Sequence, residues 1–400
     1  KFSLASEMSV NLMKGYDMGL NYIIQDNMKY QPQERKIKTI TITLTQSCNL
    51  KCSYCYENNK SPKIMTFNTA QQIIDKELQN KDKYTGFEID LFGGELFLQF
   101  ELIKQITDYA CQKLNDFPHT IFLTTNGTLV HGDVQKWLID HKDCVICGLS
   151  LDGTREMHNT NRSNSFDSID IDFFAENYPM QDIKMTISRE TLPTMAEGVI
   201  YAHKRGFEVS CNLAYGIDWS DPDNVAILDR ELHKLIDFYI ANPQITPCSM
   251  LSMGITNVLL EDKRPHRHCG AGIEMTAYDV DGRSYPCQFF MPLSVGEEKA
   301  SKAKDLKFYE DFIPSELADE KCRDCVINRC CPNCYGSNYA STGNIYHRDI
   351  NMCRLTRIMV KACSYFYAMQ WQNGQLNVEG NELQSMLKSI EVIQKELVIS

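Results

Sequence analysis

Three cysteines near the start of the chain have a spacing that suits metal binding. Cys48, Cys52 and Cys55 are arranged as C-x3-C-x2-C. Three thiols on one short loop can hold three irons of a [4Fe–4S] cluster, which leaves the fourth iron open for a small molecule. An open position is typical of catalytic metal sites, whereas structural sites usually have four protein ligands. A zinc site with a distant fourth ligand is the alternative interpretation.

A second group of cysteines lies between residues 266 and 354. Its members are Cys269, Cys287, Cys322, Cys325, Cys330, Cys331, Cys334 and Cys353. CxxC pairs with distant partners are typical of zinc ribbons, and zinc is therefore the alternative to iron–sulfur clusters here. The six other cysteines are expected to be packing residues of the core: Cys111, Cys144, Cys147, Cys211, Cys248 and Cys363.

The composition excludes several classes of protein. The chain has 400 residues, 43% hydrophobic and 23% charged, which is typical of a globular protein. Its formal charge of −11 gives no electrostatic reason to expect nucleic acid as the main partner. No apolar run approaches the ~20 residues that a membrane span needs, and the first residues lack a signal-peptide core. The 17 cysteines are an odd number in a large chain, so we expect free thiols in a reducing cytoplasm.

Alternating strand and helix patterns position the first cysteines. Strands are expected at 39–45, 88–92, 120–124, 145–151, 183–187 and 208–213, with helices at 69–79, 102–114, 134–141 and 194–205. This order predicts parallel βα units, whose chemistry gathers where the strands end. Further helices are expected at 1–36, 225–240, 355–372 and 380–398.

The first cysteine motif, with Tyr54 before its third cysteine, resembles the defining motif of the radical S-adenosylmethionine (SAM) superfamily. Gly93-Gly94-Glu95, after the next strand, resembles the GGE element that binds the methionine amino group in that family. The resemblance implies SAM bound at the open iron of a [4Fe–4S] cluster. One-electron reduction of SAM then gives a 5′-deoxyadenosyl radical, which takes a hydrogen atom from the substrate.

The resemblance also implies a set of cofactor contacts. The expected SAM-binding residues are Tyr54, Gly93, Gly94, Glu95, Asn126, Ser150, Asp152, Arg162 and Ser188. Ser150 is expected to contact the ribose, with Ser188 as the weaker choice. Arg162 and Arg189 are possible partners of the SAM carboxylate, the alternative being surface ion pairs. No catalytic residue is assigned.

The later cysteines, together with the segment 279–287, resemble the SPASM domain, which carries two auxiliary [4Fe–4S] clusters. The resemblance implies that the second auxiliary cluster is held by Cys322, Cys325, Cys331 and Cys353. The first would be held by Cys269, Cys287 and Cys334, its fourth iron being open or held by His268 or a substrate thiolate. Because adjacent residues of an extended segment point apart, only one of Cys330 and Cys331 should be a ligand. We favour Cys331 and expect Cys330 to be a thiol beside the cluster.

The predicted fold class is α/β, a partial (β/α)6 TIM-like barrel followed by a Cys-rich, loop-rich SPASM domain. The expected parts are an N-terminal helical extension (1–37), a radical SAM core (38–213), a connector (214–265), the SPASM domain (266–354) and C-terminal helices (355–400). The Cys-rich region is expected to have little core of its own and to depend on what its thiols bind.

The resemblance implies an oxidoreductase that modifies ribosomally synthesised peptides. Sulfatase maturases have an aspartate base where this chain has Gln288, and an amide cannot accept that proton, so this activity is disfavoured. We expect a thioether bond from sulfur to carbon in a Cys-containing precursor peptide, with flavodoxin or ferredoxin as electron donor. The alternatives are carbon–carbon cross-linking, another protein-modifying SPASM reaction, and a non-catalytic Fe–S electron carrier.

Overall fold

The computed structural model describes residues 36–179, 181–260, 268–310, 313–314 and 316–397. The helix expected at 1–36 therefore lies outside the described residues, apart from Lys36. Within the described ranges, no helix combines the length and the apolar character that crossing a membrane would require.

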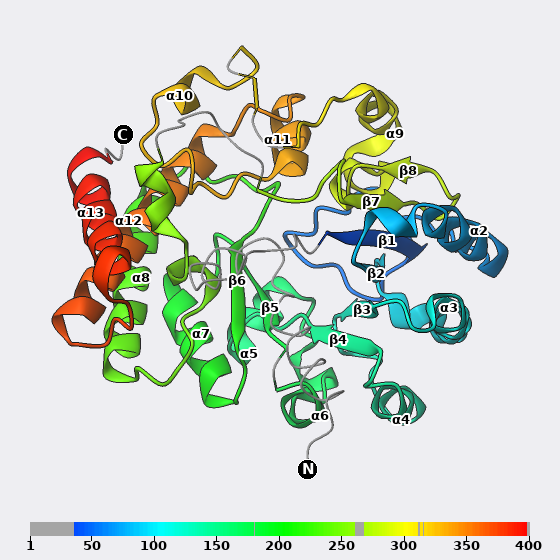
Figure 1. Cartoon of the computed structure of the whole chain (residues 1–400). Coiled ribbons are helices and arrows are strands. Elements are labelled where there is room, and N and C mark those ends of the chain that lie inside the picture. The colour runs from blue at the N-terminus through cyan, green and yellow to red at the C-terminus, as the bar shows by residue number, and fades with distance from the viewer. Residues whose placement is uncertain (1–35, 180, 261–267, 311–312, 315, 398–400) are drawn as a thin grey trace.

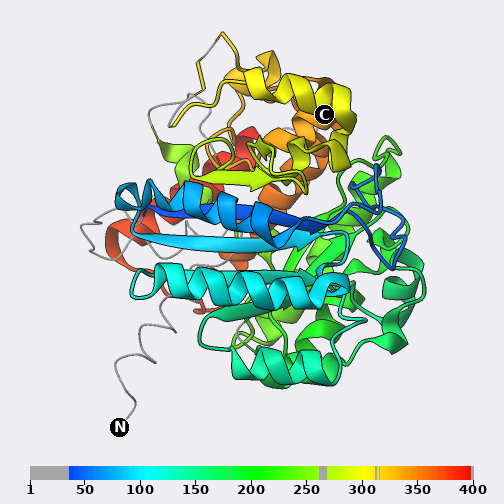
Figure 2. The ribbon, with the colours of Figure 1, turned by 90° about the vertical axis from the view of Figure 1, so that its right-hand side faces the viewer.

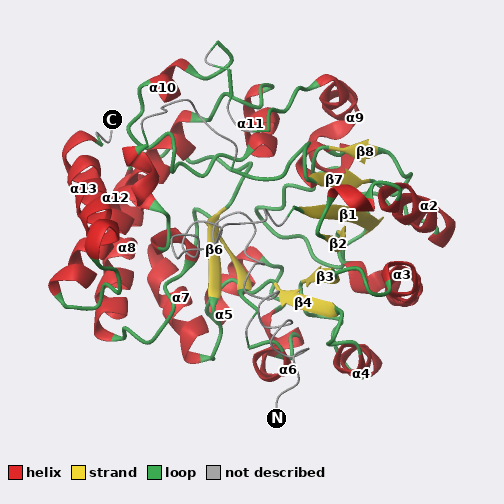
Figure 3. Ribbon diagram, in the orientation of Figure 1, coloured by secondary structure: helices red, strands yellow, loops and turns green. Residues whose placement is uncertain are grey.

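Parallel strands form the centre of the molecule (Figures 1 and 3). The strands are β1 (Ile37–Thr45), β2 (Gly86–Gly93), β3 (His119–Thr125), β4 (Val145–Leu149), β5 (Ile183–Ile187), β6 (Val209–Leu213), β7 (Met275–Tyr278) and β8 (Ser284–Tyr285). One sheet has the order β4-β3-β2-β1-β7-β8, and β5 pairs with β6. An isolated bridge between Ser150 and Lys184 connects the two sheets, so β1 to β6 curve into the predicted partial barrel.

Helices cover the outside of this barrel and extend it at one end (Figure 1). They are α2 (Phe67–Leu78), α3 (Phe100–Leu114), α4 (Asp133–Asp140), α5 (Arg155–Asn161), α6 (Ile171–Asn177), α7 (Met195–Lys204), α8 (Asp223–Ala241), α9 (Pro292–Lys302), α10 (Glu320–Arg323), α11 (Tyr335–Thr342), α12 (Ile350–Gln372) and α13 (Gly380–Glu396). The sequence pattern missed α5 and α6, because helices of seven residues are too short to establish a period.

Alternation along β1 and β2 separates an apolar outer layer from a polar lumen. Phe87, Ile89 and Leu91 are buried in the main core with the helices. The intervening Asp90 accepts a hydrogen bond from Thr41 Oγ1 on β1 at 3.3 Å. Since neighbouring residues of a strand point to opposite faces, the carboxylate side of β2 lines the inside of the barrel.

The Cys-rich region is part of the sheet and has a core of its own. β7 pairs in parallel with β1, and β8 pairs antiparallel with β7. A second apolar cluster, separate from the barrel core, includes the buried Phe290, Met291 and Leu293. The expectation of little core in this region was therefore wrong, because aromatic and aliphatic side chains between the cysteines pack against one another.

Candidate functional site

The loop after β1 carries the first three cysteines, and we call residues 46–56 the cluster loop. It lies where the parallel strands end (Figure 2). Burial raises the pKa of Cys48 to about 11 and also raises the pKa of Cys52. Lys60 Nζ lies 3.0 Å from the Sγ of Cys55. Desolvated thiols of this kind bind metal by releasing their protons, so the loop is suited to hold a cationic centre.

The described residues include no ready-made group of donors for a single metal ion. Among the described residues, no three His, Cys, Asp or Glu side chains converge closely enough to hold one metal ion. Thiols that each bind a different iron of a cube lie farther apart than the ligands of one zinc ion. A [4Fe–4S] cluster at this loop stays the prediction made from the cysteine spacing.

A buried ion pair holds the cluster loop against the barrel. The Tyr54 hydroxyl donates to Asp152 Oδ2 at 2.7 Å, and Arg162 Nε lies 2.9 Å from the same oxygen. The Arg162 guanidinium also lies over the Tyr54 ring, 5.4 Å from its centroid. Asp152 is fully buried and accepts two more hydrogen bonds, from Thr186 N and Asn161 Nδ2. The carboxylate thus connects the loop to β5 and α5.

Hydrogen bonds to the loop backbone and to Asn49 complete this anchoring. Ser53 N donates to the carbonyl of Asn161 at 2.9 Å. Asn126, which follows β3, donates its Nδ2 to Asn49 Oδ1 at 2.9 Å. The Asn49 amide in turn donates to Thr128 Oγ1 at 2.8 Å. Asn126 was expected to contact SAM, and the structure places its side-chain amide against the cluster loop.

The two glycines before Glu95 permit a close approach between β2 and the cluster loop. A Cβ atom on Gly94 would lie 2.4 Å from the Ser47 carbonyl oxygen and 2.9 Å from Cys48 Cβ. A Cβ on Gly93 would lie 2.4 Å from the Thr45 carbonyl oxygen, and its φ of +150° is unusual for other residues. A larger residue at either position would collide with the chain that leads to Cys48. The glycine pair therefore allows Cys48 to lie directly beside the end of β2.

Glu95 itself is buried behind the loop. Its Oε1 accepts hydrogen bonds from Phe97 N and Thr125 Oγ1, and its Oε2 accepts one from Asn126 N at 2.9 Å. Burial raises the pKa of Glu95, while these hydrogen bonds oppose the shift. A carboxylate fixed in this way can receive a ligand ammonium group without rearranging, which fits the contact expected from the GGE resemblance.

The other expected SAM contacts lie at the same edge of the barrel. Ser150 follows β4, and its backbone N donates to the Thr125 carbonyl. Ser188 is buried and donates to Asn161 Oδ1 at 2.8 Å. Arg162 is buried with Asp152, whereas Arg189 is half exposed and pairs with its neighbour Glu190. Arg189 is therefore the surface ion pair that the sequence left as an alternative.

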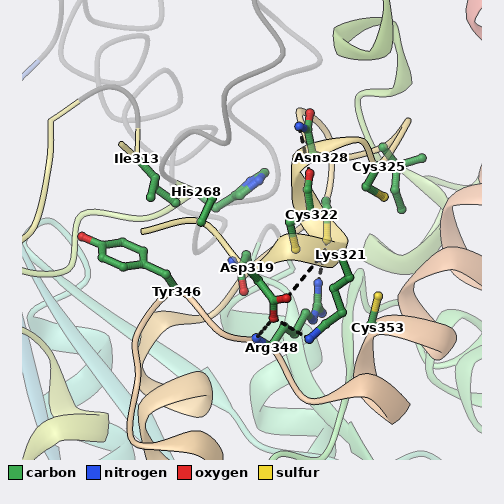
Figure 4. Close-up of a pocket in the computed structure, with 14 residues that line it drawn as sticks. His268, Ile313, Asp319, Lys321, Cys322, Cys325, Asn328, Tyr346, Arg348 and Cys353 are labelled. Atoms are coloured by element: carbon green, nitrogen blue, oxygen red, sulfur yellow. Dashed lines mark hydrogen bonds and ion pairs between the residues drawn. The ribbon is translucent and has the colours of Figure 1, made fainter. Parts of the chain in front are cut away.

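Four later cysteines surround one cavity in the C-terminal region. Cys322, Cys325, Cys331 and Cys353 all line it, although they come from α10, the loop after it and α12. Figure 4 shows three of these thiols around the opening, with Arg348 below them. These are the four ligands expected for the second auxiliary cluster. Cys330 is buried in the main core, with its Sγ 3.5 Å from the Ile327 carbonyl, and does not line the cavity.

The three thiols expected for the first auxiliary cluster are also neighbours. Burial raises the pKa of Cys287, and the charges of Cys334 and Cys269 raise it further. Cys334 is the N-cap of α11, and its Sγ accepts a hydrogen bond from Ser337 N at 3.4 Å. His268, a possible fourth ligand of this group, lines the cavity of the Cys322 group instead.

Arg348 is a site residue that the sequence reasoning missed. It is buried, and its guanidinium donates to Cys331 Sγ at 2.6 Å and to Thr356 Oγ1 at 2.7 Å. Its backbone N donates to Asp319 Oδ2 at 3.3 Å. The feature of the sequence that could have indicated Arg348 is a basic residue inside a cysteine-rich segment. Its positive charge offsets the negative charge of thiolates that share a low-dielectric site.

Three aromatic rings connect the cluster loop with the C-terminal thiols. Tyr56, directly after Cys55, stacks on Phe289 with ring centroids 4.2 Å apart. Tyr215 contacts Phe289 in an edge-on arrangement, with ring centroids 5.7 Å apart. Burial raises the pKa of Tyr215, and the charge of Cys334 is the next cause, so this ring lies beside the later thiols. These rings therefore extend from the cluster loop toward Cys334.

Parallel barrels with three thiols on the loop after the first strand form a class of iron–sulfur enzymes. In this chain residues 42–230 match the model of the radical SAM superfamily. These residues therefore form a radical SAM domain, which confirms the resemblance drawn from the cysteine spacing.

Two curated relatives and one solved structure are similar to large parts of the chain. A cysteine-type anaerobic sulfatase-maturating enzyme of Clostridium perfringens is 25% identical over 327 residues, which are 72% of this chain and 85% of that protein. The uncharacterized protein MJ0907 of Methanocaldococcus jannaschii is 30% identical over 169 residues, 41% of this chain and 58% of that protein. The solved structure of native anSMEcpe with bound AdoMet and Cp18Cys peptide has a TM-score of 0.63 and 19% identity. The aligned residues cover 85% of this chain and 99% of the chain of that structure, and this similarity supports the fold.

We expect Asp152→Asn to loosen the cluster loop. The substitution leaves Arg162 without its counter-charge in a buried site, which costs about 3–5 kcal/mol. The measurements are the thermal unfolding of the protein and the iron bound per chain after anaerobic reconstitution. Asp167→Asn is the matched control, because Asp167 forms the same type of ion pair at the exposed surface. Equal stability and iron content in both variants would contradict the anchoring role.

We expect Arg348→Gln to lower the midpoint potential of the auxiliary cluster that the sequence predicts at Cys331. A positive charge beside a ligand sulfur favours the reduced cluster, so its removal should shift the potential by tens of millivolts, on the order seen for such contacts. The titration is followed by EPR in a background of Cys48→Ala, Cys52→Ala and Cys55→Ala, which leaves the auxiliary sites. Arg230→Gln, at an exposed position on α8, is the control. An unchanged potential with full iron content would refute the prediction.

Proposed function

We propose that this chain is a radical SAM/SPASM peptide maturase that joins a cysteine sulfur to a carbon atom of a precursor peptide. The observation that carries the proposal is the open three-thiol loop, fixed against the carboxyl edge of a radical SAM barrel. A second group of three thiols, Cys269, Cys287 and Cys334, adds a position where a substrate sulfur could bind. The proposed cofactors are SAM and three [4Fe–4S] clusters, one at the cluster loop and two auxiliary.

Peptide binding is supported by the relatives. The Clostridium perfringens relative is named as an enzyme that matures sulfatases, and the structurally similar anSMEcpe was solved with a peptide bound. We therefore propose a peptide substrate for this chain, with a reduced flavodoxin or ferredoxin as electron donor. The free thiols in this chain suit a reducing cytoplasm.

Gln288 favours cross-linking over formylglycine formation. It directly follows Cys287 and is buried, and its Oε1 has no hydrogen-bond partner among the described residues. An amide oxygen that faces no donor can accept a hydrogen bond from a peptide N–H, but it cannot take up a proton as a carboxylate does. The residue thus suits the orientation of a bound peptide better than the base role of the sulfatase maturases.

The residues of this chain would hold SAM and the substrate in place, and the cofactors would supply the bond-breaking chemistry. When bound at the cluster loop, SAM supplies a 5′-deoxyadenosyl radical that removes a hydrogen atom from substrate carbon. Glu95 would hold the methionine ammonium group, and the Asp152–Arg162 pair would keep the loop in place. Forming the carbon–sulfur bond removes the carbon-bound hydrogen atom, the thiol proton and one further electron from the peptide; a cluster held by Cys269, Cys287 and Cys334 would accept this electron.

The test is an anaerobic assay of the reconstituted protein with dithionite, SAM and Cys-containing peptides encoded beside its gene. We expect 5′-deoxyadenosine together with a peptide that has lost two hydrogen atoms and can no longer be alkylated at cysteine. A Cys48→Ala variant should release no nucleoside, because one iron of the cluster loses its ligand.

Each alternative gives a different product in the same assay. A carbon–carbon bond removes two hydrogen atoms and leaves the thiol open to alkylation. A formylglycine product replaces the cysteine sulfur with oxygen, and would support the sulfatase-maturase alternative despite Gln288. Failure to release 5′-deoxyadenosine under any reductant would overturn the proposal and leave an electron carrier.

A further inference from the structure

Two thiols outside the three cysteine groups lie side by side at the opposite end of the barrel. Cys111 is in the last turn of α3, and Cys144 directly precedes β4. Their Sγ atoms are in hydrogen-bond contact at 3.5 Å, and both residues are half-buried. Both side chains pack against the main core, as expected, and Cys147, Cys211, Cys248 and Cys363 are fully buried.

The register of the sheet brings a histidine to this pair. Ile121 pairs with Val145, so the first residue of β3, His119, lies near Cys144. His119 Nδ1 lies 2.8 Å from the Phe117 carbonyl oxygen, which can only accept, so Nδ1 carries the proton. The other nitrogen, Nε2, is buried, and a hydrogen-bond contact with Cys111 raises the pKa of His119. It is therefore available to the neighbouring thiols as a base.

The electrostatics of the three groups agree with this geometry. The contact with Cys144 lowers the pKa of Cys111, burial opposes the shift, and His119 lowers the pKa further. The contact with Cys111 raises the pKa of Cys144. One thiolate and one neighbouring thiol are the two groups that form a disulfide after oxidation. Cys147, two residues after Cys144, is fully buried, and burial raises its pKa well above the usual value.

We propose that Cys111 and Cys144 form a redox-active dithiol that hydroperoxides convert to a disulfide between α3 and the start of β4, with His119 as a positioning residue. The Cys111 thiolate attacks the peroxide oxygen, giving a sulfenic acid and releasing water from hydrogen peroxide. The Cys144 sulfur then attacks the sulfenic sulfur, and a second water leaves. In total the two thiols lose two electrons and two protons. The peroxide takes up these electrons and protons and becomes two molecules of water.

The geometry allows this closure without unfolding. A disulfide bond is about 2.05 Å long, so the sulfurs must approach by roughly 1.5 Å, which side-chain rotation can supply. The site lies where the strands begin, whereas the cluster loop and the expected SAM contacts lie where they end. Oxidation here can therefore occur without displacing a predicted cluster ligand, and the inference does not depend on the proposed peptide chemistry.

The experiment treats the anaerobically reconstituted full chain with an equimolar amount of hydrogen peroxide, followed by alkylation, trypsin and mass spectrometry. We expect one disulfide between the tryptic peptides 105–113 and 143–155 that dithiothreitol reverses. Because the second peptide holds both Cys144 and Cys147, fragment ions between these residues must assign the bond to Cys144. Absorbance of the clusters, recorded in parallel, should decay more slowly than the disulfide forms.

Variants separate a specific dithiol from general oxidation. Cys147→Ser should form the disulfide at the parental rate, whereas Cys144→Ser should leave Cys111 as a sulfenic acid that dimedone labels. His119→Gln should slow disulfide formation about several-fold while leaving the fold intact, because a nearby imidazole promotes the thiolate. The proposal is overturned if Cys111 and Cys144 in the unmodified chain both remain alkylatable, or if Cys111 bonds to Cys147 or to random partners.

Discussion

The arrangement of the site depends on a single desolvated carboxylate. Asp152 follows β4, yet its two oxygens bind groups from the cluster loop, α5 and β5. The guanidinium of Arg162 balances its charge and covers the ring of Tyr54. A loop with three desolvated thiols has little apolar surface of its own, so its shape must come from contacts with its surroundings. This ion pair supplies them at the edge where parallel barrels hold their ligands.

Features that depend on a short segment of the chain could be predicted from the sequence. The spacing of Cys48, Cys52 and Cys55 and the strand before them depend on neighbouring residues, and the radical SAM match confirms that interpretation. The expectation that only one of Cys330 and Cys331 is a ligand came from the opposite directions of adjacent side chains, and only Cys331, the favoured one, lines the cavity. Whether these thiols bind clusters stays a prediction.

Contacts between distant segments could not be predicted in the same way. Arg348 reaches Cys331 and Tyr215 reaches Phe289 only after the chain has folded, and no periodic pattern links such positions. The contact of Cys111 with Cys144 depends on how the end of α3 packs beside the start of β4, which no periodic pattern in the sequence predicts. The core of the C-terminal region was missed because its aromatic residues are scattered among cysteines that attracted the metal-binding interpretation.

The pairing of β7 with β1 has a consequence for how the chain can be divided. β1 is central in its sheet because a strand from beyond residue 270 occupies its second side. A fragment that ended after β6 would leave this side of β1 with unpaired peptide groups along an apolar strand. Exposed edges of that kind recruit strands from other molecules, so an isolated barrel would be prone to aggregate. The C-terminal region thus covers the edge of the barrel sheet through β7. The barrel and the C-terminal region therefore belong to one cooperative folding unit.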